Sequence, residues 1–138
     1  MPFKFATIVQ KAHYIPNLTN RRIIEEFISY MNDKDLSENH RINNLKVMIS
    51  FASFIGPKIS FYQIKNKEQI LQLLDSKKRS SEEDPEKKWI TTWNGYLKRT
   101  KLFFRWLYNR TCQNNIEVTE SEWLTPDYFK INPRNQED

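Results

Sequence analysis

One segment near the C-terminal end constrains the fold more than any other. It runs from Trp89 to Arg110 and reads WITTWNGYLKRTKLFFRWLYNR. At about 100° per residue this sequence predicts a long helix with two chemically different faces. The apolar face carries Trp89, Trp93, Tyr96, Leu97, Phe103, Phe104 and Leu107, and the polar face carries Asn94, Lys98, Lys101 and Arg105. Such a helix packs one face on a core and presents the other outward.

The polar face of this predicted helix is positive throughout. Residues 87 to 110 contain seven Lys or Arg and neither Asp nor Glu, whereas a solvated helix usually mixes both charges. A cationic face that also carries Asn and Thr suits a polyanion, because phosphates attract cations and base edges need amide donors and acceptors. The pattern favours nucleic acid as the partner, and a merely solvated face is the alternative interpretation.

Composition favours an all-α fold. The 138 residues include only two Gly, against nine Phe, six Tyr and four Trp, whereas sandwiches and barrels need Gly at their corners. A chain of this length is expected to form one compact unit. The single Cys cannot form an internal disulfide, and the sequence shows neither a signal peptide nor an apolar run that could span a bilayer. We therefore expect a cytoplasmic protein with no membrane contact, associated with the nucleoid when bound to DNA.

Capping residues and periodicity predict three further helices upstream. The first is expected to begin at a cap formed by Thr19 or Asn20, and the second begins at Ser37 and ends before Gly56. Trp93 and Trp106 are expected in the core rather than stacked on unpaired bases, because they recur at helical spacing. The predicted helices cover about residues 19–31, 37–55 and 66–74, with an extended connector at 58–65 and a mobile loop at 76–86.

Three regions follow from these boundaries: an N-terminal arm at 1–16, whose state the sequence leaves open, a helical domain at 17–125 and a linker at 126–138. After Ile116 the chain has six acidic and two basic residues, so the positive charge lies upstream. Trp123 and Leu124 are expected to fold back as an anchor. Residues 133–138, which are poor in apolar side chains, are expected to be mobile.

Spaced residues in two of the predicted helices resemble a known family. In the second helix they are Ser37, Met48, Phe51 and Phe54, and in the fourth they are Thr91 or Thr92, Leu97, Lys101, Phe103-Phe104 and Trp106-Leu107. Their order and register resemble the N-terminal core-binding domain of tyrosine recombinases and phage integrases over about residues 20–134. The chain departs from the family pattern at His40 and Asn44, where the family has Thr and Tyr. At position 101, Lys instead of the more usual Arg keeps the charge and loses the bidentate fork.

The resemblance implies a four-helix, SAM-like orthogonal bundle with a C-terminal linker. It also implies binding of double-stranded DNA with little sequence selectivity, as one module of a site-specific recombinase or integrase of a mobile element. The implied partners are DNA, a C-terminal catalytic domain of the same parent chain and other recombinase protomers. The candidate DNA-binding residues are Lys98, Lys101, Arg105, Asn94 and Thr91 on the fourth helix and Lys46, Asn43, His40 and Arg41 on the second.

The sequence predicts no chemistry of its own for this chain. The family's catalytic Arg-His-x-x-Arg arrangement with a later Tyr nucleophile does not occur. His13 and His40 are far apart and have neither metal-like nor triad-like spacing. We therefore expect no enzymatic activity, cofactor or metal. The alternatives are a helical protein-interaction module with an incidental basic face and a DNA-binding regulator without a recombinase partner domain.

Overall fold

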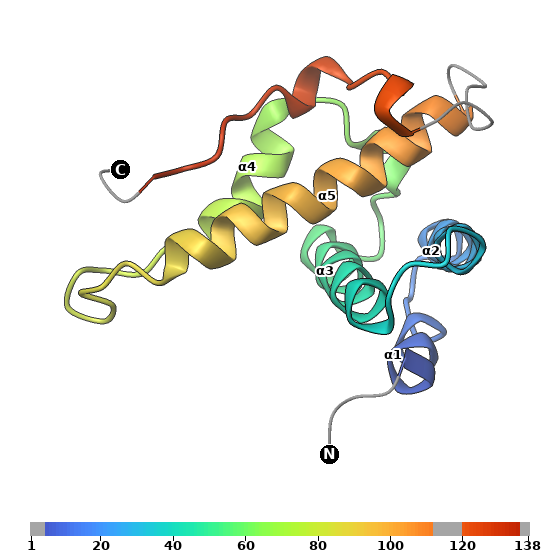
Figure 1. Cartoon of the computed structure of the whole chain (residues 1–138), viewed down its shortest axis with the longest axis horizontal. Helices are drawn as coiled ribbons and strands as arrows, with labels where there is room; N and C mark the ends of the chain where they lie inside the picture. The colour runs from blue at the N-terminus through green and yellow to red at the C-terminus, as the bar shows by residue number, and fades with distance from the viewer. Residues whose placement is uncertain (1–4, 112–119, 136–138) are drawn as a thin grey trace. The chain divides into compact units, whose positions relative to one another are not determined.

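A computed structural model of the chain describes residues 5–111 and 120–135 (Figure 1). These residues form five α-helices, three short 3-10 helices and no strand, which confirms the predicted all-α class. The four-helix SAM-like arrangement stays a prediction. Contacts divide the chain into two compact units, Met1–Ile64 and Lys65–Asp138, rather than the single unit expected from its length.

The first unit contains a helix that the sequence did not predict. Its elements are α1 (Phe5–Ala12), α2 (Leu18–Asp33), α3 (Glu38–Ile55) and the single turn η1 (Phe61–Gln63). Helix α1 contacts both α2 and α3 and buries Ile8 and Ala12, one helical turn apart, and the Glu38 carboxylate of α3 accepts the N–H of Phe5 at 3.2 Å. Packing of that face therefore stabilises a helix whose sequence carries no start signal.

The predicted caps of the first unit are partly confirmed. Ser37 caps α3 by accepting the N–H of His40, and Gly56 ends it at φ +85°, a conformation that favours glycine. The predicted cap of α2 at Thr19 or Asn20 is wrong. Asn17 caps this helix, with its Oδ1 accepting the N–H of Asn20 at 2.9 Å. The side chain of Asn20 is used elsewhere, because it holds the connector after α3.

The second unit is built around the long helix identified in the sequence. Its elements are α4 (Lys67–Asp75), α5 (Trp89–Thr111), η2 (Glu120–Glu122) and η3 (Asp127–Phe129). Helix α4 starts in a capping box formed by Asn66 and Gln69. Trp93 and Trp106 are both 2% exposed, which confirms their predicted place in the core.

The predicted linker from residue 126 onward is packed where it is described. The chain runs back along α5 towards its first turn, and η3 contacts α4 (Figure 1). Trp123, Phe129 and Ile131 are buried, whereas Leu124 is half-exposed, so only Trp123 of the expected pair is an anchor. Arg134 is hydrogen-bonded to α5, and residues 136–138 of the expected mobile end lie outside the described residues.

Candidate nucleic-acid interface

The start of α5 is fixed by the loop that precedes it. The Asp84 carboxylate accepts the N–H of Trp89 at 2.8 Å, which satisfies one of the free donors at the helix N-terminus. Lys87, just before the helix, adopts a positive φ of 55°. The loop therefore sets the direction of a helix whose apolar face is buried along its length.

The exposed part of α5 carries cations and hydroxyl groups. Thr91, Thr92 and Lys98 are exposed, and Arg99 and Lys101 are partly exposed. Partial burial lowers the pKa of the Arg99 guanidinium, which still keeps its charge at neutral pH. Within the part of the chain that the structure describes, Lys98 and Lys101 have no ion-pair partner, and α5 itself contains no Asp or Glu. This surface can attract phosphates without a competing internal carboxylate.

Two of the predicted DNA-binding side chains on α5 are instead bound within the protein. Asn94 donates from Nδ2 to the carbonyl oxygen of Arg134 and accepts the N–H of Arg134 at Oδ1, both at 2.8 Å. Arg105 donates from Nη2 to the carbonyl oxygens of Glu120 and Trp123, at 2.9 and 3.0 Å. The periodicity of α5 assigned these side chains to the polar face correctly. It could not show that a returning backbone segment, with its own unpaired groups, lies along that face.

Asn109 is a structural residue that the sequence analysis missed. It is fully buried, donates to the carbonyl oxygen of Leu124 at 2.8 Å and accepts the N–H of Leu124 at 3.0 Å. It lies one turn after Arg105, on the side of α5 that the C-terminal segment follows. The available signal was a polar residue following a strongly apolar run, at a helical spacing from Asn94 and Arg105.

The candidates on the first unit lie on the N-terminal half of α3. His40, Asn43 and Lys46 are exposed and spaced three residues apart, so they share one side of the helix. Arg41 is partly buried: its Nη1 donates to Asn32 Oδ1 at 2.7 Å, and its guanidinium lies 4.7 Å from the centre of the Phe5 ring. Arg41 thus links all three helices of its unit and has less freedom to contact a ligand.

Metal centres and membrane-spanning helices are two other features that bear on function. No group of three or more His, Cys, Asp or Glu side chains in this part of the chain lies close enough to hold a metal ion. None of the described helices combines the length and the hydropathy needed to cross a membrane.

No family model matches the chain, and comparisons with curated proteins and with solved structures likewise give no significant match. The resemblance to recombinase core-binding domains therefore depends on the order and spacing of residues given above. Function has to be inferred from the chemistry of the exposed faces of α5 and α3.

The internal bonds of Arg105 lead to a testable difference between two cations of α5. Arg105→Ala should lower the free energy of unfolding by about 1 to 3 kcal/mol, because two backbone carbonyls lose a charged donor. Lys98→Ala, at an exposed side chain, should change it by less than about 0.5 kcal/mol. Urea titration followed by tryptophan fluorescence measures both, since all four Trp belong to this unit. Equal effects would contradict a structural role for Arg105.

Proposed function

We propose that this chain binds double-stranded DNA with little sequence selectivity, as the core-binding module of a site-specific tyrosine recombinase or integrase. The observation that supports this most strongly is the exposed side of α5. Lys98 and Lys101 lie there on the same side as Thr91, on a helix without any acidic residue. Backbone phosphates are bound by such Lys and hydroxyl side chains, which set position and affinity without reading sequence.

The internal bonds of α5 fit the sequence-tolerant part of this proposal. An asparagine amide can read an adenine edge, but in the free protein both the donor and the acceptor of Asn94 are hydrogen-bonded to the backbone of Arg134. Arg105 is likewise committed to carbonyl oxygens. In the free protein, what α5 offers to DNA is then charge and hydroxyl groups, which contact the backbone rather than the bases.

A second surface, on α3, adds an amide for contact with bases. Asn43 is exposed between His40 and Lys46. A Lys contributes phosphate attraction, and an exposed Asn has its amide available for a base edge. We treat the α3 and α5 surfaces as separate contributions to affinity.

In this proposal the chemistry belongs to other parts of the parent protein. The chain carries no set of Arg, His and Tyr residues like that of the recombinases it resembles, so it would act without catalysing a step and without a cofactor. A catalytic domain of the same parent chain and other protomers on the DNA would complete integration and recombination. We place this activity in the cytoplasm, at the nucleoid.

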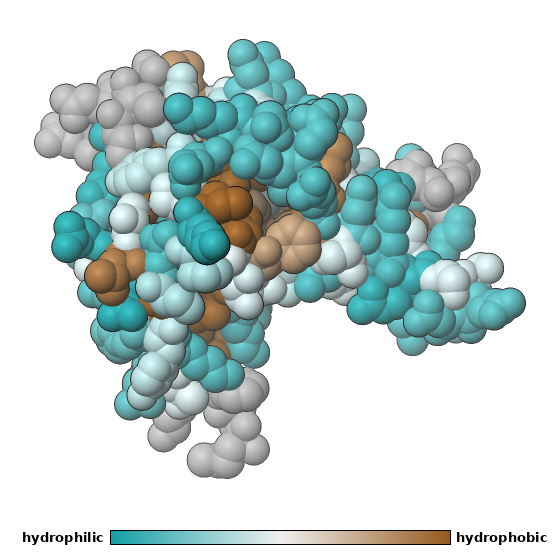
Figure 2. Space-filling view, turned by 180° about the vertical axis from the view of Figure 1, so that it is seen from behind, coloured by the Kyte–Doolittle hydropathy of each residue, from teal (hydrophilic) through white to brown (hydrophobic). Residues whose placement is uncertain are grey.

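A second candidate function is a protein-interaction module. The first unit exposes large apolar side chains, with Tyr14 82%, Leu18 67% and Phe54 46% exposed. Tyr14 also borders a groove of about 330 Å³ formed by the end of α1, the turn after it and α3. Surface apolar residues of this kind are common singly, and Figure 2 shows hydrophobic areas surrounded by hydrophilic ones on the face in view. This candidate predicts binding that responds little to salt.

Removing the two outward lysines of α5 tests DNA binding. The double variant Lys98→Ala and Lys101→Ala should bind a DNA duplex about tenfold more weakly at low salt, with a salt dependence shallower by about 1 to 2 in log-log slope. The matched control is Lys65→Ala with Lys67→Ala, which removes the same charge from exposed positions at the start of α4. Fluorescence anisotropy across a salt series measures both. A flat salt response of the unaltered chain, or equal losses in the two double variants, would contradict phosphate binding by α5.

A further inference from the structure

The C-terminal segment at residues 120–135, here called the strap, is attached to α5 at three places. Arg105 holds the carbonyls of Glu120 and Trp123, Asn109 holds Leu124, and Asn94 holds Arg134. The last attachment lies one turn from Lys98, beside the surface proposed to meet phosphates. The strap therefore occupies both the donor and the acceptor of the Asn94 amide.

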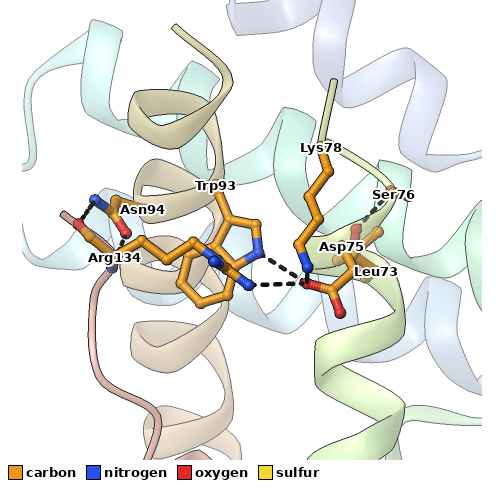
Figure 3. Close-up of polar contacts among 7 residues, drawn as sticks. All are labelled: Leu73, Asp75, Ser76, Lys78, Trp93, Asn94 and Arg134. Carbon is orange, nitrogen blue, oxygen red and sulfur yellow. Dashed lines mark hydrogen bonds and ion pairs between the residues drawn. The ribbon is translucent and has the colours of Figure 1, made fainter. Parts of the chain in front are cut away.

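The side chain of Arg134 makes further contacts that hold the end of the strap, with Asp75 and with two Trp rings (Figure 3). Its Nη2 lies 3.8 Å from Asp75 Oδ1, and its guanidinium lies 4.9 Å from the ring centre of Trp93 and 5.4 Å from that of Trp89. The same carboxylate oxygen accepts the indole N–H of Trp93 at 3.2 Å and lies 3.6 Å from Lys78 Nζ. The Asp75 carboxylate, at the end of α4, thus faces two cations, Arg134 and Lys78.

The two ends of the strap are held by different forces. Its first part is anchored by burial of Trp123, Phe129 and Ile131 together with the buried amide of Asn109. Beyond Ile131, Asn132 and Pro133 are exposed, and the Arg134–Asp75 pair has side chains that are 25% and 43% exposed. A partly hydrated ion pair changes the equilibrium between its paired and separated states by a factor of about five at most, and dissolved salt screens it. The end of the strap is thus held without buried apolar side chains, unlike its base.

We propose that residues 132–135 form a latch that closes over Asn94 in the free protein and opens when DNA binds α5. This inference rests on the proposed function. A phosphate is a charged, multidentate acceptor that competes with Asp75 for the Arg134 guanidinium. Opening frees the donor and acceptor of Asn94, which are the two functions an adenine edge requires. Arg105 stays structural, because its partners belong to the anchored part of the strap.

The test weakens the Arg134–Asp75 ion pair without altering any residue proposed to touch DNA. Asp75→Asn in the full chain removes the charge that faces Arg134 and keeps an oxygen for the Trp93 indole. It should raise the affinity for a labelled DNA duplex about fivefold, because a larger fraction of the protein is open before binding. Asp127→Asn is the matched control: it removes one negative charge from the strap, where Asp127 is 95% exposed and pairs with Lys130. The control should change affinity by less than about twofold.

Amide exchange provides a second, independent reading on the unaltered chain. The N–H groups of Arg134 and Leu124 donate to Asn94 and Asn109, so each reports on one attachment. Saturating duplex DNA should reduce protection at Arg134 and leave Leu124 protected. If Arg134 stays equally protected in the complex, or if the two Asp variants raise affinity equally, the latch is wrong and DNA binding still stands. If neither the unaltered chain nor Asp75→Asn binds duplex, both the latch and the proposed function fail.

Discussion

Replacing Phe104 by alanine is expected to lower the free energy of unfolding by about 3 to 5 kcal/mol. Phe104 is buried in α5, with its ring centre 5.2 Å from Phe103, 5.3 Å from Phe129 and 6.3 Å from Tyr128. Truncation removes apolar contact area and leaves a cavity that the surrounding helix cannot fill fully. It also removes the ring on which η3 packs, and aromatic pairs contribute about 0.5 to 1.5 kcal/mol beyond burial.

Urea unfolding followed by tryptophan fluorescence measures this loss. The matched control is Leu124→Ala, in the same unit, because its side chain is 50% exposed and its backbone bonds to Asn109 do not depend on it. Leu124→Ala should lower the free energy of unfolding by less than about 1 kcal/mol, since little buried apolar area is lost. A cost for Phe104→Ala as small as that of the control would mean that η3 does not pack on α5 as described.

The strongest sequence signals were those that depend on one helix alone. The period of α5 correctly places Trp93, Leu97, Phe103 and Phe104 in the core, and Ser37 and Gly56 mark the ends of α3. These features need only local geometry, which a sequence states directly. Helix α1 is not predictable from its sequence, for the opposite reason. Its stability comes from packing on α2 and α3 and from the Glu38 carboxylate of α3, which accepts the N–H of Phe5.

The C-terminal region shows where composition misleads. Two prolines and an excess of acidic residues suggest a mobile linker. The composition of a segment does not show that one or two of its side chains are buried. Phe129 and Ile131 are buried and hold the C-terminal segment on the second unit, and Asn94 and Asn109 hydrogen-bond to its backbone. The same bonding explains why the predicted DNA face of α5 is only partly available. A polar side chain on a helix can face water, a ligand or a passing backbone, and period alone does not distinguish these.

Three asparagines share one role across the two units. Asn20, Asn94 and Asn109 each donate to a backbone carbonyl and accept a backbone N–H from an extended segment. An extended segment without a neighbouring strand leaves both kinds of backbone group unpaired, and burying them unpaired is costly. The planar amide of Asn offers a donor and an acceptor side by side, as the edge of a strand does. In this way the helices hold connectors that contain few tight turns.

Asn20 is the asparagine whose loss should cost most after the core aromatics. Its side chain is fully buried in α2, donates to the carbonyl of Ile59 at 3.0 Å and accepts the N–H of Phe61 at 2.7 Å. Asn20→Ala leaves both backbone groups without this partner, beside the buried ring of Phe61. The free energy of unfolding should fall by about 2 to 4 kcal/mol, because each buried unsatisfied group costs about 1 to 3 kcal/mol.

Thermal unfolding followed by far-ultraviolet circular dichroism measures the total loss, and exchange of the Phe61 amide locates it. The matched control is Asn43→Ala, which truncates an exposed asparagine of α3 in the same unit and should change stability by less than about 0.5 kcal/mol. Because the first unit contains no Trp, the tryptophan signal of the second unit shows whether the two unfold together. Unchanged protection of the Phe61 amide in Asn20→Ala would mean that the connector is held by other contacts, and that the amide of Asn20 is not what fixes the chain after α3.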